Sequence, residues 1–184
     1  MKKFAVVFFS LFCIHIYGAI IENTRTATID KATSYISYHL SNPLHSWDGV
    51  CKAVEGAIEY DAKNFQITKV TITAKVASFD SKNKLRDERM LKITNAQVYP
   101  EVKFISTSVK ENINAVIVNG IITFHGISKP ISFTASEAFL NKRKIITSKF
   151  VLLLTDFNVE RPSLLLMKTD NEMNMSFSVE IPMQ

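Results

Sequence analysis

The chain contains repeated segments in which apolar and polar residues alternate. Between Lys69 and Val76, every even-numbered position is apolar and every odd-numbered position is polar. Because successive side chains of a β-strand point to opposite faces of a sheet, this pattern is typical of a strand with one solvated face. Similar segments recur, and we predict eight strands, over residues 32–40, 50–60, 70–77, 102–109, 115–124, 131–137, 145–154 and 173–181.

Residues that favour turns separate these segments. Such residues occupy 61–64 and 111–114, and Gly126 begins a turn that ends before Pro130. Most of the intervals are too short for a helix, so neighbouring strands are expected to pair as antiparallel hairpins. Eight such strands close most readily into an up-and-down barrel or a related sandwich, because closure removes exposed sheet edges.

One segment departs from the alternation. Between residues 83 and 95 the apolar positions have a loose helical spacing, and no run of β-branched residues occurs. Asp80 or Ser81 could cap the start of this helix, and Tyr99 before a proline marks the return to extended chain. We therefore predict an all-β domain, an antiparallel eight-stranded barrel with one short helix.

The N-terminus has the order of a secretory signal peptide. Two lysines follow Met1, an uncharged apolar run covers 4–17, and the small residues Gly18 and Ala19 come next. We predict a signal peptide over residues 1–18, with cleavage after Gly18 or Ala19. The remaining 19–184 would form a single domain in the periplasm or outside the cell.

Charge and cysteine content narrow the function classes. The formal net charge is +5, and loss of the two lysines of the signal lowers it to +3, which is too mild to indicate nucleic-acid binding. Transient contact with anionic lipid and a homodimer stay open as alternatives. Lys142, Arg143 and Lys144 form the densest basic run, which we interpret as a solvated hairpin turn. Cys51 would be the only cysteine left after cleavage, and we expect a buried thiol there.

The sequence carries no motif that indicates catalysis or metal binding. It has no GxSxG nucleophile elbow and no CxxC pair, and His39, His45 and His125 lack the close spacing of a zinc site. We expect no enzyme activity, no metal and no cofactor. A cleft that gathered His39, Arg86 and Asp87 would be the observation in favour of an enzyme.

Several unusual strings follow one another along the chain. They are HSWDG at 45–49, ASFDS at 77–81, RD at 86–87, YPEVKFIS at 99–106, FHGISKPI at 124–131, DF at 156–157 and RPSLL at 161–165. In this order they resemble the YceI-like family of exported bacterial proteins. The resemblance implies a lipocalin-like β-barrel that encloses a long apolar ligand, such as a polyisoprenoid or an isoprenoid quinone, without catalysis.

The chain departs from the family pattern at one place. Where many relatives have Arg-Asp-x-His-Leu, this sequence has Arg86-Asp87-Glu88-Arg89-Met90, so a role of that family histidine does not carry over. The HSWDG string also resembles a branch of the family whose ligand need not be the same. The identity of the ligand therefore stays open.

A binder of a long hydrocarbon needs a hollow barrel, an apolar lining and a few polar groups at its mouth. Removal of the signal leaves nine Phe and five Met for this purpose. We predict a ligand-binding set made of Tyr38, Trp47, Phe79, Arg86, Met90, Phe104, Phe124, Phe133, Phe157, Leu164 and Phe177. Ordinary core packing is the alternative for each aromatic residue, because alternation identifies a face and not whether that face is filled.

Two of these residues have a second interpretation. Arg86 could hold a ligand headgroup, or it could form a structural ion pair that fixes the helix to the barrel. Trp47 could anchor a protein partner, since Trp is common at interfaces. The sequence thus predicts an exported carrier of a long-chain ligand, with a non-catalytic scaffold for a membrane redox protein as the alternative.

Overall fold

The structure of the chain is a computed structural model that describes residues 23–113, 115–164 and 167–183. The predicted signal peptide lies outside the described residues. The elements run in the order β1 (Thr24–Thr28), β2 (Tyr35–Asn42), β3 (His45–Cys51), β4 (Val54–Asp61), β5 (Ile67–Lys75), η1 (Val76–Ser78), β6 (Phe79–Asp80), α1 (Lys84–Ile93), β7 (Glu101–Asn112), β8 (Ala115–Phe124), β9 (Ile127–Leu140), β10 (Arg143–Leu153), η2 (Leu154–Phe157), β11 (Ser163–Leu164), β12 (Met167–Lys168) and β13 (Glu172–Pro182).

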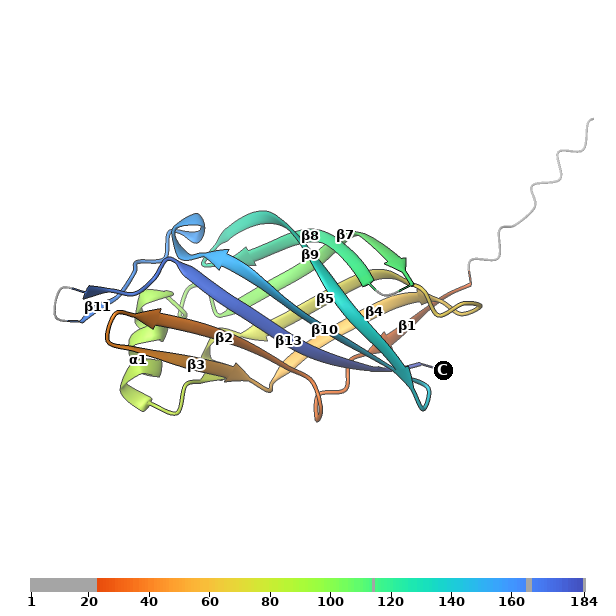
Figure 1. Cartoon of the computed structure of the whole chain (residues 1–184), viewed down its shortest axis with the longest axis horizontal. Coiled ribbons are helices and arrows are strands. Elements are labelled where there is room, and N and C mark those ends of the chain that lie inside the picture. Colours follow the sequence, from red (N-terminus) through yellow and green to blue (C-terminus); the bar gives the residue numbers. More distant parts are fainter. Residues whose placement is uncertain (1–22, 114, 165–166, 184) are drawn as a thin grey trace, which may run out of the picture.

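A single antiparallel sheet curls into a barrel (Figure 1). Its strand order is β1-β4-β5-β7-β8-β9-β10-β13-β2-β3-β6. The consecutive strands β3 and β4 stand near opposite ends of this order, and only Lys52 and Ala53 separate them. Strand β3 pairs with β2 and β6, whereas β4 pairs with β1 and β5. The β3–β4 segment therefore joins the two ends of the sheet and closes the barrel.

The predicted eight-stranded barrel with one helix is confirmed as an architecture. The eleven strands of this sheet occupy eight positions around the barrel. Three positions are each shared by two strands, namely β1 with β2, β3 with β4, and β5 with β6, and the other five strands occupy one position each. The prediction was wrong in detail at 50–60, where the chain bends at Lys52 and is not one strand. It also missed β1 and most of β3, because their polar residues hide the alternation.

The alternation seen in the sequence places the inner face of most predicted strands correctly. Along β5 the residues Val70, Ile72 and Ala74 line the interior, as their even-numbered spacing predicts. Strand β7 changes phase at a bulge between Ser106 and Ser108, so that both Phe104 and Val109 face inward. A bulge adds one residue to a strand and so reverses the side on which later residues lie.

The helix α1 lies across one end of the barrel (Figure 1). Asn83 caps it, because its side-chain oxygen accepts a hydrogen bond from the Arg86 amide at 3.1 Å. The predicted caps Asp80 and Ser81 are therefore wrong by two to three residues. Instead, the Ser81 amide donates to the Asp87 carboxylate at 3.1 Å, which fastens the first turn of the helix to the preceding loop.

The opposite end of the barrel contains a buried ion-pair cluster. Lys144 is 3% exposed, and its ammonium lies 2.8 Å from a Glu111 oxygen and 3.0 Å from a Glu137 oxygen. It also donates to the Phe65 carbonyl at 3.1 Å. The interpretation of this segment as a solvated turn is thus wrong at Lys144, although Lys142 is exposed.

Arg143, next in the same segment, has partners on the outer face of the barrel. Its guanidinium lies 2.8 Å from an Asp30 oxygen and 2.6 Å from a Glu180 oxygen. The hydrogen bond from Arg143 lowers the pKa of the Asp30 carboxyl below its ordinary value. The Asp30 amide also donates to the Glu180 carbonyl at 2.8 Å, so this network ties the β1–β2 link to β10 and β13.

We expect Lys144→Met to lower the free energy of unfolding by about 3–5 kcal/mol, because it leaves the two glutamates without their buried counter-charge. Urea denaturation of the purified protein measures this change. Lys149→Met is the matched control, since Lys149 is exposed on the outer face of the same strand and should change stability by no more than about 0.5 kcal/mol. Equal effects of the two substitutions would contradict the structural role of the cluster.

Candidate ligand-binding site

The barrel is hollow. A cavity of about 220 Å³ occupies its interior, and side chains from every strand position around the barrel line it. This volume is well above the roughly 10–15 Å³ that one water needs, and an apolar cavity of about 150 Å³ is enough to hold a benzene-sized molecule. The deep lining is entirely aliphatic or aromatic and includes Ile58, Ile72, Val118, Ile122, Ile146 and Met175.

Four phenyl rings form one continuous section of the cavity wall. Phe133 lies at its centre, stacked on Phe150 with ring centroids 5.1 Å apart. Phe177 meets Phe133 edge-on at 5.7 Å, and Phe104 lies 5.6 Å away on the other side. These residues come from β7, β9, β10 and β13. Because aromatic pairs favour such offset and edge-to-face contacts, the rings hold one another against the wall.

Two glycines make room for lining rings, and each lies on the strand next to the one that carries its ring. The Phe104 ring lies directly over Gly120 of β8, and the Tyr38 ring lies over Gly49 of β3. A Cβ atom at either glycine would overlap the ring above it. The absence of a side chain therefore lets each ring lie flat on the sheet, which keeps the centre of the barrel open.

Tyr38 is the one tyrosine among the residues that line the cavity. Burial, and to a smaller extent the nearby Asp87 carboxylate, raise the pKa of its hydroxyl to about 12, while Arg86 acts in the opposite direction. The hydroxyl is therefore uncharged at neutral pH. It can donate a hydrogen bond close to the mouth without adding charge to the cavity.

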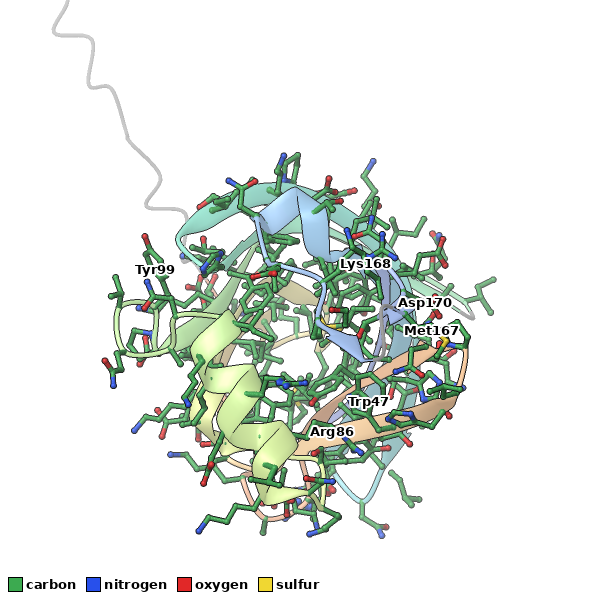
Figure 2. The ribbon with its side chains drawn as sticks, turned by 90° about the vertical axis from the view of Figure 1, so that its left-hand side faces the viewer. Trp47, Arg86, Tyr99, Met167, Lys168 and Asp170 are labelled. Atoms are coloured by element: carbon green, nitrogen blue, oxygen red, sulfur yellow. The ribbon has the colours of Figure 1, made fainter. Side chains whose placement is uncertain are left out.

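The helix α1 and the segment after η2 supply the polar part of the lining. Arg86, Arg89 and Met90 of α1 reach the cavity, and Glu160 reaches it from the other segment. The Arg86 guanidinium lies over the Trp47 ring, 5.0 Å from the ring centroid. Figure 2 looks into this end of the barrel and shows Arg86 and Trp47 beside each other at the rim. We call this end the mouth.

A model of the YceI-like domain matches residues 28–181. The chain belongs to the YceI-like family. A UPF0312 protein of Photorhabdus laumondii is 33% identical over 128 residues, which are 64% of this chain and 67% of that protein. Protein YceI of Escherichia coli O157:H7 is 27% identical over 156 residues, which are 80% of each protein.

The fold of a solved structure agrees with this assignment. A polyisoprenoid binding domain from Saccharophagus degradans has a TM-score of 0.70 with this chain. The match covers 86% of this chain and 98% of that domain, with 11% sequence identity. At this identity the likeness concerns the fold, which is the curled antiparallel barrel of the family.

The structure places nine of the predicted ligand-binding residues in the wall of the cavity: Tyr38, Trp47, Phe79, Arg86, Met90, Phe104, Phe124, Phe133 and Phe177. Phe157 does not line it. It is 1% exposed and packs against Phe124 with ring centroids 5.6 Å apart. Leu164 lies in β11, and its side chain is outside the described part of the structure. Ligand contact stays a prediction for all eleven residues.

Sequence reasoning missed other members of the lining. Arg89 was noted only as a departure from the family pattern, although its spacing of three from Arg86 puts both on one face of a helix. The aliphatic residues that form most of the wall were also not singled out. Their alternation was visible in the sequence, but alternation does not distinguish a hollow interior from a packed one.

The remaining candidate residues are dispersed. His39 bonds to Asp48 at 2.9 Å outside the cavity lining, and His125 bonds to the Phe157 carbonyl at 2.8 Å. Within the described ranges, no three His, Cys, Asp or Glu residues are grouped as metal ligands would be.

Cys51 is fully buried, and burial raises the pKa of its thiol. The same ranges contain no helix with the length and apolar character to cross a membrane.

We expect Gly120→Ala to lower the free energy of unfolding by about 1–3 kcal/mol, because the new methyl group forces the Phe104 ring off the sheet. Phe104→Leu should then lower the free energy of unfolding by less in the G120A background than in the wild type. A double-mutant cycle by urea denaturation measures this coupling. Additive effects would contradict the contact between the ring and Gly120.

Proposed function

We propose that this YceI-like protein is a non-catalytic binding protein that holds the long apolar chain of an amphiphile inside its barrel. The observation that carries the proposal is the cavity itself, which is apolar in its depth and polar only at the mouth. Burial of apolar surface contributes about 25 cal/mol per Å², so a long tail binds in such a site without specific hydrogen bonds. A polar head would remain at the mouth.

Among long-chain ligands we favour a polyisoprenoid or isoprenoid-quinone tail. The phenyl wall around Phe133 offers broad flat surfaces for a branched, unsaturated chain. The Saccharophagus degradans neighbour with the same fold is a polyisoprenoid binding domain, which supports the same class of tail here. The position of Trp47 in the cavity wall, under Arg86, supports a role in this site rather than in a scaffold.

We test the proposal by the lipid content of the protein. Protein purified from its native host is extracted with organic solvent, and the extract is analysed by mass spectrometry. We expect one or more long-chain species in near-stoichiometric amount. Repeated extracts without any such species would contradict the proposal.

Filling the cavity tests the location of the ligand. Val118→Phe adds a ring on the inner face of β8, and we expect it to remove most of the bound lipid. Ile121→Phe is the matched control, because Ile121 is 38% exposed on the outer face of the same strand. Retention of lipid in V118F, with the fold intact by circular dichroism, would place the ligand outside the barrel.

The proposal includes export to the periplasm or beyond the cell, on the basis of the N-terminal signal. Cell fractionation followed by N-terminal sequencing tests it. We expect the processed chain to begin at Ala19 or Ile20. A chain in the cytoplasmic fraction that still begins at Met1 would contradict export.

A further inference from the structure

We propose that the ligand carries an acidic head group, a carboxylate or a phosphate, which Arg86 and Arg89 bind at the mouth. This inference rests on the proposed function and narrows its ligand to an anionic amphiphile. It distinguishes such a ligand from a neutral one, such as a quinone or an alcohol with the same tail.

The helix α1 directs both guanidinium groups to the same place. Arg86 and Arg89 are three residues apart, a spacing that puts their side chains on one face of a helix. Both line the cavity, together with Met90 from the same helix. Arg86 is half-buried and Arg89 is exposed. The pair therefore spans the boundary between the apolar interior and the solvent, where the head group of an inserted amphiphile would lie.

These two arginines have no acidic partner among the described residues. No carboxylate there lies within 4.0 Å of either guanidinium, whereas Arg143 has two such partners. The contact made by Arg86 is with the Trp47 ring. A structural ion pair is thus not what holds Arg86 at this position, and its hydrogen-bond donors remain available.

The nearby carboxylates have hydrogen-bond partners other than the two arginines. Asp87 accepts hydrogen bonds from the Ser81 amide at 3.1 and 3.3 Å. Asp48 is bonded to His39 at 2.9 Å. Glu160 lines the cavity and is the one acidic residue that does so. The lining therefore carries two positive charges against one negative charge, which favours an anion over a neutral head.

The chemistry of the guanidinium group favours an oxyanion in particular. Its planar donors match the two oxygens of a carboxylate or phosphate, and it stays protonated at all physiological pH values. The cation–π contact with Trp47 holds the Arg86 guanidinium at the mouth without using its charge for an ion pair. The Tyr38 hydroxyl, neutral because of its raised pKa, supplies a further donor in the same lining without repelling an anion.

The test compares ligands that share one tail. Full-length protein freed of lipid is titrated with hexadecanoic acid, hexadecyl phosphate and 1-hexadecanol, below the concentrations at which they aggregate. Trp47 is the only tryptophan of the chain and lies at the mouth, so its emission reports binding directly. Calorimetry measures the same dissociation constants without relying on fluorescence. This second method is needed for variants that alter the surroundings of Trp47.

We expect at least one of the two acidic ligands to bind about tenfold or more tightly than the alcohol, as charge-assisted hydrogen bonds imply. Arg86→Gln and Arg89→Gln should each reduce this preference, and the double variant should abolish it while the alcohol affinity stays the same. Lys84→Gln is the matched control, because it removes one charge from the same helix outside the cavity lining. Which acid binds more tightly identifies the head group as carboxylate or phosphate.

Three results would overturn either the inference alone or the proposed function on which it rests. Equal affinities of the acids and the alcohol for the wild type would refute the acidic head group and leave the proposed function standing. The acidic head group would also be refuted if R86Q and R89Q lose no more affinity for the two acids than K84Q does. Failure of all three ligands to bind a folded protein, together with lipid-free extracts from the native host, would refute the proposed function itself.

Discussion

Closure of the sheet through the bent β3–β4 segment is the constraint on which the rest of the structure depends. Strand β3 pairs with β2 while β4 pairs with β5, so the chain from His45 to Asp61 satisfies both ends of the sheet. Closure satisfies the backbone groups along the wall and fixes a circumference of eight strand positions. Whether the enclosed space is hollow then depends only on the side chains that point inward.

Those side chains keep the interior open by lying against the wall. The ring of Phe104 occupies the space that a side chain at Gly120 would need, and Tyr38 does the same at Gly49. The phenyl rings around Phe133 support one another sideways along the wall. A large amount of aromatic surface is thereby presented to a cavity without filling it, which is a suitable surface for a hydrocarbon tail.

The two ends of the barrel differ in how their charged side chains are paired. At one end Lys144 is enclosed with Glu111 and Glu137, and the charges satisfy one another inside the fold. At the mouth, Arg86 and Arg89 reach the cavity without an acidic partner within ion-pair distance in the described ranges. The first arrangement pairs the charges within the fold, while the second leaves the guanidinium donors without a carboxylate partner in the described ranges.

The sequence by itself determined the β-barrel class, the single helix and the inward face of most strands, because side-chain alternation is a local property with a period of two. The ordered strings also indicated the YceI-like family. Alternation could not reveal the bend at Lys52, which depends on pairing with different partners on either side, nor the burial of Lys144, whose partners are 33 and 7 residues away. Only the tertiary structure decided that the interior is hollow and that Arg89 lies with Arg86 at its mouth, since a cavity depends on how side chains from all strands fill a common space.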